Sequence, residues 1–83
     1  MKIRFFGSIS QTRELDLTLE GEKELLDVIR GNEVLKKNLL LNNSIRPDVL
    51  VLINGIDYRL LGGSKAKLNE GDEIVIIPIN HGG

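Results

Sequence analysis

The residues of this 83-residue sequence that could take part in chemistry stand at its C-terminus, which ends Ile79-Asn80-His81-Gly82-Gly83. Average glycine usage is ~7%, so two final glycines arise by chance in roughly 0.5% of chains. A Gly-Gly carboxylate is unhindered, reaches backbone angles that other residues avoid, and can enter a narrow active site. The alternative is a frayed chain end, which does not explain two residues without side chains. The pattern favours a functional tail whose reactive group is the Gly83 carboxylate.

His81 is the only histidine, and the sequence contains no cysteine. A single histidine cannot form a metal site, and a disulfide or a thiol nucleophile is excluded. We therefore expect no bound metal, no bound cofactor and no catalytic residue. His81 and Gly82 are better interpreted as recognition elements of the tail, since the imidazole titrates near neutral pH; the alternative is that His81 is merely solvated.

The composition limits the classes of function. With 11 basic and 12 acidic residues the net charge is −1, which gives no electrostatic field for nucleic acid or an anionic membrane. The longest apolar run, Val49 to Ile53, is too short to span a bilayer, and no signal peptide is evident. We expect a cytoplasmic protein that is a monomer when free. So small a domain rarely encloses a full substrate pocket, so a self-sufficient enzyme is not expected.

The elements that position the tail begin with two strands. Residues 2–6 read as a strand, and residues 15–19 alternate strictly, with three leucines inward. After Gly21 the period changes, and residues 22–30 predict a helix with Leu25, Leu26 and Ile29 on one face. A second helical stretch capped by Asn32 follows and ends at residues 42–44; the pattern leaves open whether this is one helix or two.

The second half of the chain predicts a second hairpin and a final strand. Residues 49–53 form an apolar run, Asn54-Gly55 is a strong hairpin turn, and residues 56–60 form the return strand. Residues 64–72 are irregular, and Ile74 to Ile77 form a last strand that is apolar on both faces. A strand of that kind belongs in the middle of a sheet, and its natural place is beside the first strand.

The whole chain, residues 1–83, is therefore interpreted as one α+β domain with a flexible tail at residues 80–83. The order of elements predicts a β-grasp, a mixed sheet that wraps around one main helix. Period-2 counting places Phe6, Val75 and Ile77 on the sheet face opposite the helix. These residues are either an exposed docking face for partners or are covered by the segment 64–72.

The sequence resembles the ubiquitin-like sulfur carriers. The resemblance rests on the order of elements, on Asn54-Gly55, on the Gly71-Asp72 turn before an apolar strand, and on the final Gly-Gly. It covers nearly the whole chain. The group includes the ubiquitin-related modifier, the small subunit of molybdopterin synthase, the thiamine sulfur carrier and the small archaeal modifier proteins.

The resemblance implies a substrate or carrier protein rather than an enzyme. An enzyme similar to the ubiquitin-activating enzymes uses ATP and Mg²⁺ to adenylate the Gly83 carboxylate, and a sulfur donor or sulfurtransferase converts it to a thiocarboxylate. Its sulfur then goes to a tRNA base or a small-molecule precursor, or the acyl group goes to a lysine of a target protein. Which acceptor is served stays open.

Two alternatives accompany this interpretation. The His81-Gly82-Gly83 ending is similar to that of the ubiquitin-related modifier, whereas Pro78 is similar to one of the paired prolines before Gly-Gly in the molybdopterin synthase small subunit, which works with a large subunit. Here position 79 is isoleucine and not a second proline. The other alternative is a non-covalent ubiquitin-like interaction domain without tail chemistry.

Overall fold

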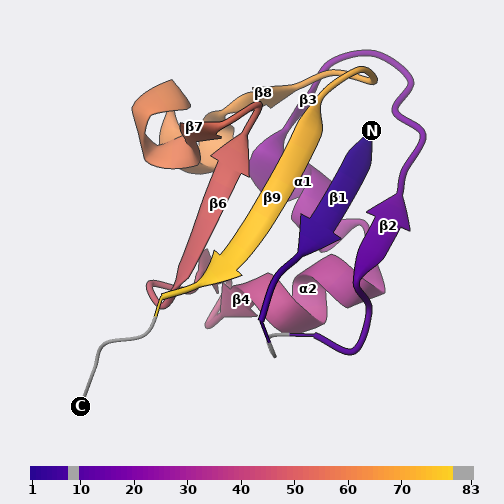
Figure 1. Cartoon of the computed structure of the whole chain (residues 1–83). Helices are drawn as coiled ribbons and strands as arrows, with labels where there is room; N and C mark the ends of the chain where they lie inside the picture. The colour runs from indigo at the N-terminus through magenta and orange to yellow at the C-terminus, as the bar shows by residue number, and fades with distance from the viewer. Residues whose placement is uncertain (8–9, 80–83) are drawn as a thin grey trace.

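The central element is strand β9 (Glu73–Pro78), which lies in the middle of a five-stranded sheet (Figure 1). The computed structural model describes residues 1–7 and 10–79. The strand order is β2-β1-β9-β6-β7, in which β9 pairs parallel to β1 (Lys2–Phe5) and antiparallel to β6 (Val49–Ile53). The prediction of a mid-sheet last strand, parallel to the first, is confirmed.

The outer strands are shorter than expected. Strand β2 covers Glu14–Asp16, and the leucines of residues 15–19 are half-buried against the core as predicted. The predicted return strand is present as β7 and pairs with β6, but it covers only Ile56–Asp57. Its predicted extension to residue 60 is wrong, because a 3-10 helix, Tyr58–Leu61, follows it. Asp57 ends the strand, because its carboxylate accepts a hydrogen bond from the Arg59 amide at 2.9 Å.

Two short helices cover one face of the sheet, α1 (Leu25–Arg30) and α2 (Glu33–Leu39). The predicted start at Glu22 is wrong, because Lys23–Glu24 form strand β3 and pair with β8 (Lys67–Leu68). Asn32 caps α2 as predicted, and its Oδ1 accepts from two amides of the first turn at 3.0 and 3.1 Å. Within the described residues, no helix is long and apolar enough to cross a bilayer.

The helical region ends earlier than predicted, at Leu39, and a small hairpin follows it. Strands β4 (Leu40–Leu41) and β5 (Ser44–Ile45) pair antiparallel around Asn42 and Asn43. Both asparagines have positive φ, 53° and 65°, which is the backbone of a tight hairpin turn. The same chemistry operates at Asn54 and Gly55, with φ of 50° and 85°, where the hairpin was predicted correctly.

The core lies between the sheet and the helices. Alternate residues of the three central strands are buried, and α1 contributes Val28 beside Leu25 and Ile29, whereas Leu26 is only half-buried. The segment 64–72 was expected to be irregular, but it begins within the short helix Gly63–Lys65 and contains strand β8. It packs on the core side through Ala66 and Leu68, both with 0% exposure, so among described residues it does not cover the opposite face. The largest fully buried side chains are Ile3, Ile29, Leu35, Leu39, Leu68, Ile76 and Val51.

One carboxylate joins three distant segments. Glu70 accepts hydrogen bonds from the Leu19 amide and, at 3.2 Å, from the ammonium group of Met1. The same ammonium donates to the Leu17 carbonyl at 2.8 Å. The bond from the Leu19 amide, followed by that from the ammonium group, lowers the pKa of Glu70 below its ordinary value of 4.5.

This arrangement predicts a pH-dependent stability. A carboxylate whose pKa is lower in the folded state stabilises that state above its unfolded pKa, and the contribution is lost as pH falls through the folded value. We expect Glu70→Gln to melt below the wild type at pH 7, and the difference in melting temperature to shrink between about pH 5 and pH 3. The control is Glu20→Gln, since Glu20 is exposed and forms no ion pair with the residues that the structure describes. Equal melting of Glu70→Gln and wild type at pH 7 contradicts this role.

Candidate functional site

The candidate site is built on the sheet face that lies away from the helices. In Figure 1 the helices lie behind the sheet, so the viewer looks onto this face. Because side chains alternate along a strand, burying Ile74 and Ile76 in the core turns Val75 and Ile77 outward. Strand register then places Leu52 beside Val75 and Leu50 beside Ile77.

Phe6 continues this face beyond the end of β1. Its amide donates to the Ile76 carbonyl at 2.9 Å, so the parallel pairing with β9 extends one residue past Phe5. The Phe6 side chain is 49% exposed. We refer to the residues that share this face as the outer apolar face: Phe6, Leu50, Leu52, Val75 and Ile77.

The structure brings together Phe6, Val75 and Ile77, the three residues that the sequence predicted for a docking face. Leu50 and Leu52 were missed, although both are half-buried on the same face. The signal was present, because a wholly apolar strand at residues 49–53 must place two leucines on the side away from its buried residues. A half-exposed aromatic residue together with four half-buried aliphatic residues on one sheet face is suited to a protein partner.

The polar border of this face lies on β1. Arg4 stands beside Val75 in the parallel register and is exposed. Among the described residues it forms no ion pair. A free guanidinium next to an apolar surface can form a bidentate pair with a carboxylate of a partner.

The end of β9 is held firmly where the chain leaves the sheet. The Ile79 amide donates to the Asp48 carbonyl at 2.9 Å. The Asp48 carboxylate accepts from Arg46 Nε and NH2 at 2.9 and 2.7 Å, and this hydrogen bonding raises the pKa of Arg46. The Arg46 amide in turn donates to the Leu39 carbonyl at 2.8 Å. The point at which the tail begins is thus fixed to the rest of the domain.

Gly7 makes room for the same exit point. Its φ is +69°, and a Cβ atom there would lie 2.7 Å from Cγ of Pro78. Any side chain at this position would displace the last residue of β9 as well as strain the backbone. The glycine therefore lets the end of β9 pack against the chain that follows Phe6.

The predicted tail residues, His81, Gly82 and Gly83, lie outside the described residues. Within the described residues, no group of three or more histidine, cysteine, aspartate or glutamate side chains could hold a metal ion. What the described arrangement can do is bind a protein partner beside the start of the tail.

Comparisons with known proteins identify the family. A family model described as "Urm1 (Ubiquitin related modifier)" matches residues 7–83. Ubiquitin-related modifier 1 of Schizosaccharomyces pombe is 42% identical over 48 residues, which cover 58% of this chain and 50% of that protein. Its human counterpart is 37% identical over 75 residues, which cover 81% of this chain and 74% of that protein.

The solved structures agree. The crystal structure of Sulfolobus solfataricus Urm1 superposes with a TM-score of 0.73 at 32% identity, covering 95% of this chain and all of that one. The fold is therefore the ubiquitin-like β-grasp, and the comparisons do not favour the molybdopterin synthase subunit or a non-covalent interaction domain. The chain belongs to the ubiquitin-related modifier family of ubiquitin-like sulfur carriers and protein modifiers, and it is a carrier rather than a catalytic enzyme.

Proposed function

We propose that this chain acts through the carboxylate of Gly83, which a cytoplasmic activating enzyme adenylates. A carboxylate oxygen attacks the α-phosphorus of ATP, pyrophosphate leaves, and an acyl-adenylate forms. The reaction turns an unreactive carboxylate into an acyl group with a good leaving group. ATP and Mg²⁺ belong to the active site of the enzyme, and this chain supplies the substrate group and the surface by which it is held.

The observation that carries this proposal is that strand β9 contributes to the outer apolar face and also leads directly into the C-terminal tail. Val75 and Ile77 of β9 lie on the outer apolar face, and the same strand ends at Pro78, with Ile79 bonded to Asp48. Four residues follow Ile79, and four extended residues reach at most about 14 Å. An enzyme that binds the outer apolar face therefore has the carboxylate within a short, fixed range. We propose that the activating enzyme recognises His81 and Gly82 in the channel through which the tail enters its active site.

After adenylation the acyl carbon has two classes of acceptor. Sulfide from a sulfur donor attacks it, AMP leaves with one of the two original carboxylate oxygens, and a thiocarboxylate forms. Where the donor is the persulfide of a sulfurtransferase, the product of the attack is an acyl disulfide, and a donor-protein thiol then cleaves its S–S bond, releasing the thiocarboxylate and becoming oxidised to a disulfide. Alternatively the amine of a target lysine attacks the activated carbonyl, loses a proton and forms an isopeptide bond. Membership of a family of modifiers and sulfur carriers supports both classes.

The outer apolar face gives the first prediction for this function. Phe6→Ala should weaken binding to the activating enzyme roughly tenfold, because a half-exposed aromatic ring contributes mainly when a partner buries it. The free energy of unfolding should change by less than about 1 kcal/mol. Ile76→Ala is the matched buried control and should cost about 2–5 kcal/mol of stability. Calorimetric titration with the enzyme and urea unfolding measure the two quantities.

Two results for Phe6→Ala would contradict this prediction. If this variant lost as much stability as Ile76→Ala, the ring would be part of the core and the outer apolar face would not be a free surface. If it bound the enzyme as tightly as the wild type, the enzyme would approach the tail from another side.

The tail gives the second prediction. Deleting Gly82-Gly83, or adding one residue after Gly83, should abolish adenylation and leave the melting temperature nearly unchanged. One added residue moves the carboxylate by about 3.3–3.6 Å, whereas the reacting atoms must approach to ~3–3.5 Å. Gly82→Val should also react poorly, since a β-branched side chain stiffens and widens the tail. Pyrophosphate exchange with the enzyme measures the reaction, and normal exchange by the truncated chain would refute this function.

A further inference from the structure

Strand β2 forms an edge of the sheet, where part of its backbone has no partner strand among the residues that the structure describes. Strand β2 is the last in the strand order, with no described strand on its far side (Figure 1). Leu17 and Met1 exchange two backbone hydrogen bonds, at 2.9 and 2.8 Å, so the amide and carbonyl of Leu17 point toward β1. Because these groups alternate in direction along a strand, those of Glu14, Asp16 and Thr18 point away from the sheet.

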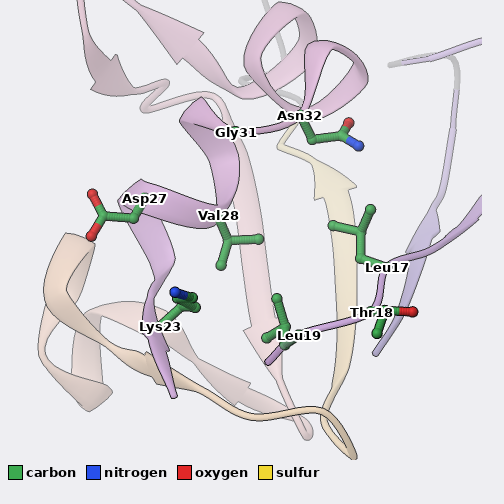
Figure 2. Close-up of a pocket in the computed structure, with 8 residues that line it drawn as sticks. All are labelled: Leu17, Thr18, Leu19, Lys23, Asp27, Val28, Gly31 and Asn32. Carbon is green, nitrogen blue, oxygen red and sulfur yellow. The ribbon is translucent and has the colours of Figure 1, made fainter. Parts of the chain in front are cut away.

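A hollow of about 340 Å³ lies beside this edge, on the helix side of the sheet. In Figure 2 the side chains of Leu17 and Leu19 lie opposite Val28 of α1, with Lys23 toward one end and Asn32 toward the other. Both leucines are only half-buried, so the walls of the hollow present aliphatic surface. A strand added to β2 would point every second side chain into this hollow, next to the leucines of the edge.

On the sheet face away from the helices, the edge strand β2 carries acidic side chains, and the neighbouring strand β1 carries basic ones. On β1, Lys2 and Arg4 stand directly opposite Asp16 and Glu14 of β2. Glu14 pairs with Lys2 at 3.2 Å, whereas Asp16 forms no ion pair within the described part of the chain. Opposite charges on neighbouring strands stabilise their pairing. The strand that follows β2 should therefore carry basic side chains on this face.

We propose that the edge of β2 binds an extended segment of another protein in which aliphatic residues alternate with lysine or arginine. Its backbone pairs with the outward groups of Glu14, Asp16 and Thr18, as in other cases of strand addition to a sheet edge. Its aliphatic side chains enter the hollow beside Leu17 and Leu19. Its basic side chains lie against the acidic face of the edge.

A second copy of this chain does not fit the same edge. Pairing two β2 strands would place Glu14 and Asp16 of one copy against the same carboxylates of the other, and like charges directly across strands destabilise a sheet. The acidic residues thus discourage self-association of an exposed edge. Strand β1 separates this edge from Val75 and Ile77 of β9, and use of the edge does not involve Gly83. Such a partner can therefore recognise the modifier after its tail is conjugated, which rests on the proposed function.

The test uses the full chain and a blocked hexapeptide in which lysine and valine alternate. We expect saturable shifts in the amide resonances of Glu14, Asp16 and Thr18. At peptide concentrations about ten times the Kd, hydrogen exchange at these outward amides should slow by about tenfold. The amides of Leu15 and Leu17 already point toward β1, so their exchange should not change.

Matched controls separate strand addition from charge attraction alone. A peptide of three lysines followed by three valines has the same charge without the alternation and should not slow exchange at the edge. Asp16→Lys should raise the Kd of the alternating peptide about fivefold, and Asp16→Asn should act in the same direction without a new charge repulsion. Glu33→Lys makes the same change in charge at an exposed position of α2 and should leave the Kd unchanged.

Three outcomes would overturn the proposal. The first is unchanged exchange at the outward amides with millimolar alternating peptide. The second is equal binding of the block peptide. The third is that, without any peptide, hydrogen exchange at the same amides slows as the protein concentration rises. That result would assign the edge to a second copy of the chain.

Discussion

The structure depends on the pairing of β9 with strands from both halves of the chain. Ile76, with 0% exposure, stands in register with Phe5 on one side and Val51 on the other. Because the strand has hydrogen-bonded neighbours on both edges, its buried residues fix the core and its outward residues fix the outer apolar face. A slip of one residue would exchange the two sets. Stability and partner recognition are therefore set by the same register.

The parallel pair β1·β9 has a further consequence for the tail. Strands that run parallel need a long crossover, and here everything between residues 6 and 72 provides it. The last strand then enters a sheet whose other parts come from earlier in the chain, and it leaves at Pro78 beside Gly7 and Asp48. The chain is therefore hydrogen-bonded to the domain up to Ile79, which suits a substrate group that must be presented at a constant place.

The sequence predicted most of this architecture, because its strongest signals are local. Alternating leucines, the Asn54-Gly55 turn and the uniformly apolar last strand led to the β-grasp and to Phe6, Val75 and Ile77 as neighbours. The errors lie where a tertiary contact overrides a local preference. Glu22 and Glu24 suit the start of a helix by charge. Lys23 and Glu24 nevertheless pair with β8, and the Leu25 amide donates to the Ala66 carbonyl beside that pair.

The sequence could not predict two other features, the hydrogen bond of Glu70 and the hollow beside β2, and the physical reason differs between them. The bond between Glu70 and the Leu19 amide joins residues 51 positions apart, and no local pattern encodes such a pairing. The hollow beside β2 depends on the distance between α1 and the edge, which only the packed structure fixes. Leu50 and Leu52, in contrast, were missed although strict alternation along residues 49–53 already implied them.

The central claim is that this domain presents the Gly83 carboxylate for activation and sulfur transfer. The most direct test is the intact mass of the purified chain after co-expression with its activating enzyme and sulfur donor, compared with the chain expressed without them. The account predicts a gain of roughly 16 Da, from replacement of one carboxylate oxygen by sulfur, that fragmentation places on Gly83 and that is absent when Gly82-Gly83 are deleted. An unchanged mass, in a preparation where the enzyme binds the chain and is active toward another carrier, would contradict it.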